Sequence, residues 1–118
     1  MLPVRLMRVV GASMAPALRS GDLVLVSRTT YHRRPPRRGE VVAFRPAALG
    51  GRALVKRLAG LPHETVELEG GRRQLGADEF FLLGDQPADS LDSRRLGPVR
   101  RAELLGPVIL RLWPPRPL

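Results

Sequence analysis

The segment RALVKRL at residues 52–58 has the two-residue alternation of a half-buried β-strand. Leu54, Lys56 and Leu58 would lie on one face of this strand, and Arg57 would lie on the other. The Lys56 amine would therefore be surrounded by apolar side chains, and burial of that kind lowers the pKa of a lysine. Segments with strand character flank this one on both sides, so we expect strands to build most of the fold.

Lys56 is the only lysine among the 20 basic Lys and Arg residues of the chain. Arginine stays protonated at every pH that a protein meets, whereas a buried lysine can become neutral and then accept a proton. A single lysine is most often an ordinary surface residue. The alternative is a site that needs a base, because arginine cannot fill that role.

Length and composition predict a mainly β chain that forms one compact domain over residues 1–118. Twelve glycines and twelve prolines interrupt the apolar segments before any of them reaches the usual length of a helix. Strands are predicted at residues 4–10, 23–27, 40–45, 52–58, 80–83 and 108–113, with a hairpin at 64–69 and 72–75 and a helical turn at 100–104. The polar stretch at residues 84–97 has no periodicity, and a loop of this length in a small domain is more often functional than idle.

The charge and the residue types limit the partners. A net charge of +9 attracts acidic partners, and a basic nucleic-acid-binding module is one interpretation. One Trp, one Tyr and three Phe supply few platforms for base stacking, so no nucleic acid is expected. With no cysteine, and with His32 and His63 isolated, no metal or cofactor is expected. The apolar runs fall short of the ~20 residues of a membrane span, so we expect a soluble, cytoplasmic protein, or a membrane-associated or extracytoplasmic one if an anchor has been removed.

The segment from Arg33 to Arg38 contains four arginines and two adjacent prolines. Prolines do not join a central strand and clustered like charges prefer solvent, so residues 29–39 are predicted to be an exposed loop. This loop is either a solvated connector or a docking patch for an acidic substrate or a nucleic acid.

Ser13 is predicted to lie at a tight corner between the strands at residues 4–10 and 23–27. Gly11 permits an unusual backbone turn there, and Pro16 disfavours a helix before it. A serine hydroxyl becomes a strong nucleophile once a base removes its proton, and a neutral lysine is such a base. Ser13 and Lys56 are therefore the candidate catalytic pair, with Gly11 and Met14 as supporting residues beside the serine.

Four segments, in order along the chain, resemble the motifs of the type I signal peptidase family of serine–lysine proteases. They are residues 11–22, 38–44, 55–62 and 84–97. The resemblance implies a curved antiparallel β-fold of the signal-peptidase or LexA-like kind, with Ser13 as nucleophile and Lys56 as general base. It also implies that Ser90 orients the lysine.

The same resemblance assigns supporting roles in the last motif. Asp92 and Arg94 would pair to hold the loop, and Asp85 is a further supporting residue. Gly11 stands where some members have a hydroxyl residue, so backbone N–H groups would stabilise the oxyanion. Gln86-Pro87 replaces the usual Asn-Arg, a departure that concerns substrate contacts more than catalysis.

The short chain without an N-terminal anchor is similar to a soluble branch of the family. This branch comprises the maturation proteases that trim the N-terminal extension of nickel-type superoxide dismutase. Residues 108–114 resemble the C-terminal segment of these proteases. The expected partner is then a protein or peptide substrate with an N-terminal extension. Two alternatives are the catalytic domain of a conventional signal peptidase that lacks its anchor, and a self-cleaving repressor-type domain. The second would also need a DNA-binding domain, for which 118 residues leave no space.

Overall fold

The computed structural model describes residues 3–89 and 91–115 and confirms the mainly β fold. The strands are β1 Val4–Arg8, β2 Leu23–Ser27, β3 Val41–Phe44, β4 Leu54–Gly60, β5 Thr65–Leu68, β6 Gly71–Gln74, β7 Phe81–Leu83 and β8 Leu104–Trp113. Short helical segments connect them, namely α1 Thr30–Arg33, η1 Ala47–Leu49, η2 Pro87–Asp89, α2 Ser93–Leu96 and η3 Arg101–Glu103. None of the helices in the described ranges has the length and apolar character needed to cross a membrane.

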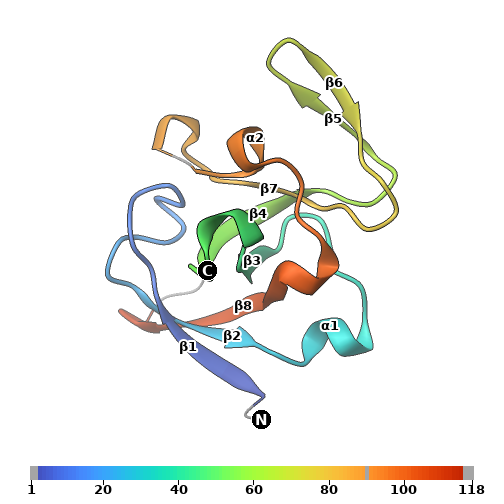
Figure 1. The fold of residues 1–118 in the computed structure, drawn as a ribbon. Helices are drawn as coiled ribbons and strands as arrows, with labels where there is room; N and C mark the ends of the chain where they lie inside the picture. Colours follow the sequence, from blue (N-terminus) through green and yellow to red (C-terminus); the bar gives the residue numbers. More distant parts are fainter. Residues whose placement is uncertain (1–2, 90, 116–118) are drawn as a thin grey trace.

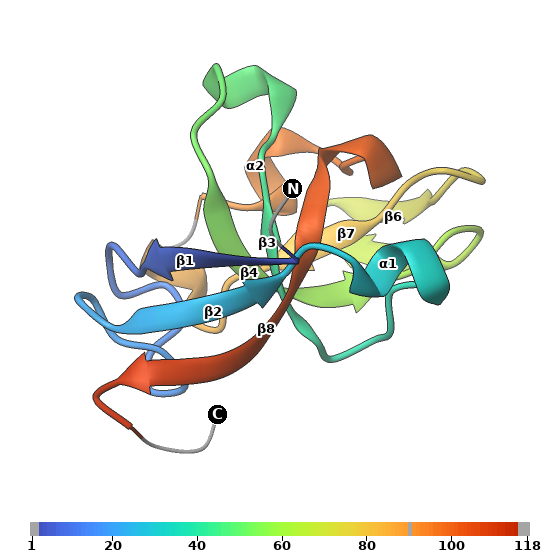
Figure 2. The same ribbon diagram turned by 90° about the horizontal axis from the view of Figure 1, so that it is seen from below.

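Six of the strands form one antiparallel sheet in the order β1-β2-β8-β3-β4-β7. Strand β8 is ten residues long, and it pairs with β3 through its first half and with β2 through its second half. Figure 2 shows β8 running alongside β2 and on towards β3. The hairpin β5–β6 is a separate two-stranded sheet that projects from the rest of the molecule (Figure 1). The predicted hairpin is confirmed, and in it Glu67 lies opposite Arg72 and forms an ion pair with it at 3.1 Å.

Strand β8 begins at Leu104, four residues before the predicted start at residue 108, so that prediction was wrong at this end. Gly106 and Pro107 weaken the strand pattern in the sequence, yet both belong to the strand. At Gly106 the backbone approaches β2 so closely that a Cβ would lie 1.7 Å from the carbonyl oxygen of Ser27. The glycine is therefore required where β8 passes from one neighbour to the other.

Gly106→Ala is expected to lower the free energy of unfolding by about 3 kcal/mol, because an added methyl group would force β8 away from the Ser27 backbone. Urea unfolding followed by circular dichroism measures the change. The matched control is Gly76→Ala, whose Cβ would meet only the flexible side chain of Glu79, at 3.3 Å. An equal loss of stability in both variants would contradict the explanation by steric overlap.

Strand β3 is buried along its whole length and separates two core clusters. The first cluster contains Val9, Met14, Leu18, Val24, Val26, Val41, Ala43 and Val108, and the second contains Tyr31, Val42, Phe44, Leu58, Phe80, Leu82 and Val99. Alternate β3 side chains enter each cluster in turn, as the two-residue period of a strand requires. Each large apolar side chain buried in this way contributes roughly 1.5–3 kcal/mol. The first cluster lies beneath the Ser13 corner, so packing there positions the serine.

The prediction of an exposed loop at residues 29–39 was wrong for part of this segment. Tyr31 lies on α1 and is buried, and its hydroxyl donates to the Glu40 carboxylate at 3.0 Å. Arg34 forms an ion pair with the same carboxylate, and Arg38 forms an ion pair with Glu64. Acidic residues that lie later in the chain thus hold two of the four clustered arginines, and the local sequence pattern does not show these partners.

Candidate active site

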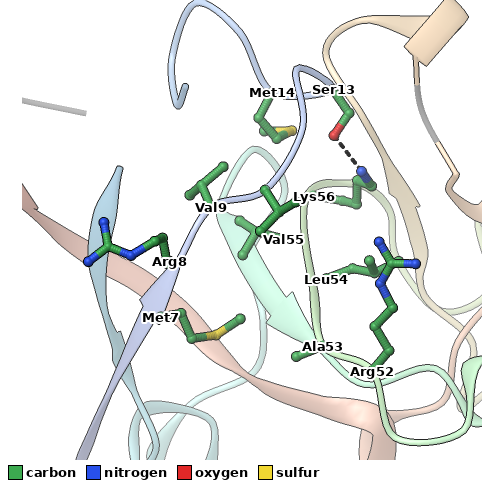
Figure 3. A pocket seen from close by; sticks show the side chains of 11 residues that line it. Met7, Arg8, Val9, Ser13, Met14, Arg52, Ala53, Leu54, Val55 and Lys56 are labelled. Carbon is green, nitrogen blue, oxygen red and sulfur yellow. Dashed lines mark hydrogen bonds between the residues drawn. The ribbon is translucent and has the colours of Figure 1, made fainter. Parts of the chain in front are cut away.

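Ser13 and Lys56 meet in the folded chain, as Figure 3 shows. The Lys56 Nζ lies 2.5 Å from the Ser13 Oγ, and a hydrogen bond joins the two atoms. Lys56 is 5% exposed and Ser13 is 8% exposed, so the pair lies almost entirely out of solvent. The alternation predicted for residues 52–58 explains this position, because Lys56 and Leu58 are buried on one face of β4.

Burial is the main cause that lowers the pKa of the Lys56 amine. The negative charge of Asp92 acts in the opposite direction, and the positive charges of Arg52 and Arg94 add to the lowering. The amine is therefore easier to deprotonate than an ordinary lysine. A neutral amine that touches a serine hydroxyl is able to accept its proton.

Lys56→Met is expected to raise the free energy of unfolding near neutral pH by about 1 kcal/mol, because a buried ionisable group is replaced by an apolar one of similar length. Between the lowered pKa in the folded state and the ordinary value of 10.5, the unfolded chain binds the extra proton, so wild-type stability rises with pH across this window. The variant should lose that rise. Urea unfolding from neutral to alkaline pH measures the free energy of unfolding of both proteins. The same change of this free energy with pH in the variant and in the wild type would contradict the prediction.

The corner that carries Ser13 is fixed from both sides. The Met14 side chain is 1% exposed and packs in the first core cluster, which anchors the residue next to the serine. Gly11 has a φ of +89°, a conformation that favours glycine, and its N–H donates to the Ser20 hydroxyl at 3.2 Å. The N–H of Leu18 donates to the Met14 carbonyl at 2.9 Å. These contacts present the Ser13 hydroxyl towards β4.

Gln86 is a supporting residue of this site that the sequence did not reveal. Its backbone N–H donates to the Ser13 carbonyl at 2.8 Å, and its side-chain amide donates to the Ala15 carbonyl at 2.9 Å. The sequence showed Gln86 only as a departure from the usual motif. A contact between residues more than 70 positions apart leaves no local signal that could have identified it.

Asp92 and Arg94 form the pair that the resemblance implies. Asp92 is fully buried and accepts hydrogen bonds from the backbone N–H groups of Gly84 and Arg94, at 2.8 and 3.0 Å. The Arg94 guanidinium donates to both oxygens of the same carboxylate, at 3.0 and 2.5 Å. Asp92 thus caps α2 and ties it to the end of β7. Ser90, predicted to orient the lysine, lies outside the described residues.

Asp85 lies on the other side of β4 from Ser13 and Lys56. Its carboxylate forms two hydrogen bonds of 3.0 Å with the guanidinium of Arg57, which points away from Lys56 as the strand alternation requires. Arg57 also donates to the Gly39 carbonyl at 2.9 Å. Asp85 therefore supports β4 and does not contact the dyad.

A groove of about 390 Å³ runs from the dyad along the start of β4. It is lined by Met7, Arg8, Val9, Val10, Ser13, Met14, Arg52, Ala53, Leu54, Val55 and Lys56. Strand β1 is at the edge of the sheet, and β7 pairs with β4 only from Arg57 onwards. Within the described residues, the backbone of Leu54–Lys56 therefore pairs on the β3 side alone. The groove lies between these two open edges.

Metal ligands do not gather in the described part of the chain, where no group of three or more His, Cys, Asp or Glu side chains could hold an ion. A hydroxyl, a desolvated amine and an adjoining groove with open strand edges together fit nucleophilic attack on an extended peptide.

Comparison with known proteins also indicates a peptidase. The model of the family described as signal peptidase, peptidase S26, matches residues 1–75 and 71–113. The chain is 34% identical to signal peptidase I of Leptolyngbya laminosa, over 86% of this chain and 65% of that protein. It is 30% identical to the probable signal peptidase I-2 of Synechocystis sp., over 87% and 60%. Mitochondrial inner membrane protease subunit 1 of Schizosaccharomyces pombe is 33% identical, over 88% and 70%. The chain thus spans less than two thirds of the length of the first two relatives.

Proposed function

We propose that this chain, which belongs to the signal peptidase family (peptidase S26), is a serine endopeptidase with Ser13 as nucleophile and Lys56 as general base. The observation that carries the proposal is the 2.5 Å contact between the Ser13 Oγ and the Lys56 Nζ in a buried site. The neutral amine takes the hydroxyl proton as the Oγ attacks the scissile carbonyl, and then gives a proton to the leaving amine. Ser90 is assigned the role of orienting the amine, and backbone N–H groups at the corner stabilise the oxyanion.

The substrate is proposed to bind as an extended strand in the groove. Backbone hydrogen bonds to the open edges of β1 and of the Leu54–Lys56 segment would hold such a peptide, which is a common mode of peptide recognition. A bound strand in this groove places its backbone next to the Ser13 hydroxyl. The reaction would then remove an N-terminal extension from a protein at one bond.

Among substrates, the pro-form of a nickel-type superoxide dismutase is proposed first, because residues 108–114 resemble the C-terminal segment of the proteases that mature this enzyme. The test is incubation of the purified pro-form with the wild-type protein and with Ser13→Ala, followed by mass spectrometry of the new N-terminus. Cleavage at one bond by the wild type alone supports both the dyad and the substrate. If the pro-form stays intact while a signal-peptide substrate is cleaved, the pro-form is rejected as the substrate, and the assignment of Ser13 and Lys56 as the dyad is kept.

The second candidate is the catalytic part of a conventional signal peptidase, and exposed apolar side chains favour it. Val10 is 79% exposed and lies close to Ser13, and Trp113 is 65% exposed at the end of β8. Leu6, Leu25 and Leu110 lie opposite one another across β1, β2 and β8, so they share one face of the sheet. Apolar surface of this kind marks an interaction site. Co-sedimentation with lipid vesicles, and cleavage of a signal-peptide substrate only when they are present, would support this candidate.

A further inference from the structure

Arg52 occupies a distinctive place in the groove. It is exposed and lies four residues before Lys56, and Figure 3 shows its guanidinium reaching up the groove towards the Lys56 amine. Its side chain forms no hydrogen bond and no ion pair with any residue in the described ranges. Arg8, the other arginine of the groove, instead turns away from it and donates to the Gly21 carbonyl at 2.8 Å. Arg52 is therefore available to a bound molecule.

The charge of the groove lining has one sign. Arg52 supplies a permanent positive charge, the Arg8 guanidinium is turned away, Lys56 is positive or neutral, and none of the lining residues described carries a carboxylate. A region of one sign attracts ligands of the opposite sign and repels those of its own. The cluster from Arg33 to Arg38 contributes nothing to this lining, and Arg34 and Arg38 are already ion-paired.

The position of Arg52 sets where an acidic side chain would meet it. Arg52 lies four residues before Lys56, a backbone separation of about 13 Å at about 3.3 Å per residue, and its guanidinium reaches back towards the Lys56 amine. A peptide that lies as a strand along the start of β4, with its scissile bond at Ser13, would therefore bring a side chain two to four residues from that bond to the Arg52 guanidinium. A carboxylate there would form the charge-assisted hydrogen bonds that a planar guanidinium favours.

We infer that Arg52 is a specificity-determining residue that selects substrates with an Asp or Glu two to four residues from the scissile bond. This inference rests on the proposed endopeptidase function and adds a charge preference to it. The like charge of Arg52 also contributes to the lowered pKa of Lys56. A substrate carboxylate would bind the one cation of the groove that lies close to the base.

The test uses fluorogenic peptides with Asp, Gln or Lys two, three or four positions to either side of the scissile bond. The wild-type protein should cleave the best Asp peptide with a kcat/KM on the order of tenfold above its Lys counterpart. Arg52→Glu should reverse this preference, with the Lys peptide preferred. Arg33→Glu is the matched control, because it changes the net charge by the same amount at an exposed arginine outside the groove, and it should keep the wild-type preference.

A binding measurement separates this inference from the endopeptidase function. In the Ser13→Ala background, fluorescence anisotropy reports the affinity of the same peptides without cleavage. An Asp preference that Arg52→Glu reverses supports the inference even if no peptide is cut, and that result would reject only the proposed activity. Equal affinity and equal cleavage of Asp and Lys peptides would overturn the inference, as would a reversal of the preference by Arg33→Glu.

Discussion

Replacing Lys56 with arginine is expected to lower kcat/KM for peptide cleavage by roughly ten-thousand-fold, close to the loss in Ser13→Ala. Arginine keeps the positive charge and nearly the same length, so the change isolates the ability to become neutral. The guanidinium stays protonated even when buried and cannot take the proton of the Ser13 hydroxyl. The lysine is suited to this role because burial lowers the pKa of its amine. The chain carries arginine at every other basic position, and here arginine should fail.

The matched control for this result is Arg57→Lys at the neighbouring position. Arg57 lies on the opposite face of β4 and pairs with Asp85, and a lysine there can keep one contact to the carboxylate. This variant should retain at least a tenth of the wild-type kcat/KM. If Lys56→Arg does not fold, Lys56→Met serves instead, because it is expected to be folded and inactive. Activity within tenfold of wild type in either Lys56 variant would reject the general-base assignment.

Asp92→Ala is expected to lower the free energy of unfolding by about 3–5 kcal/mol, the usual cost of removing one partner from a buried ion pair. Asp92 is fully buried, and its carboxylate receives the Arg94 guanidinium and two backbone N–H groups. The change leaves these donors without their acceptor and also removes the cap of α2. Cleavage activity should fall as well, because the loop at residues 84–97 carries Gln86, which holds the Ser13 backbone.

Urea unfolding of Asp92→Ala beside Glu67→Ala checks the prediction. Glu67 also pairs with an arginine, but its side chain is 76% exposed on the β5–β6 hairpin, and exposed pairs contribute less than about 1 kcal/mol. A loss in Asp92→Ala no larger than in Glu67→Ala would show that the burial of the Asp92 carboxylate adds nothing to stability.

Much of the sheet was predictable because its strands carry local signals. β2 has the predicted bounds of Leu23–Ser27, and β4 places Lys56 and Leu58 on one buried face as the alternation indicated. β8 was predicted four residues too short, because Gly106 and Pro107 serve a close approach to Ser27 that only the paired strands reveal. The strand order was not predictable, since it depends on contacts between distant segments.

The candidate site was also predictable only in part. Residue chemistry and motif order selected Ser13 and Lys56, and the structure brings their side chains together across 43 positions of sequence. Gln86 and Arg52 were not selected, because their roles depend on where they lie relative to Ser13 and the groove. Tyr31 and Arg34 were assigned to an exposed loop, since the pattern gave no sign that Glu40 would bind them both.

The central place of β8 in the sheet has a consequence for the order in which the chain folds during synthesis. Ser13 follows β1, Lys56 lies on β4, and in the order β1-β2-β8-β3-β4-β7 the strand that pairs with both β2 and β3 is β8, at residues 104–113. A nascent chain on the ribosome therefore cannot complete this sheet, and with it the pairing that places the proposed nucleophile and base, before β8 has been synthesised and has left the exit tunnel.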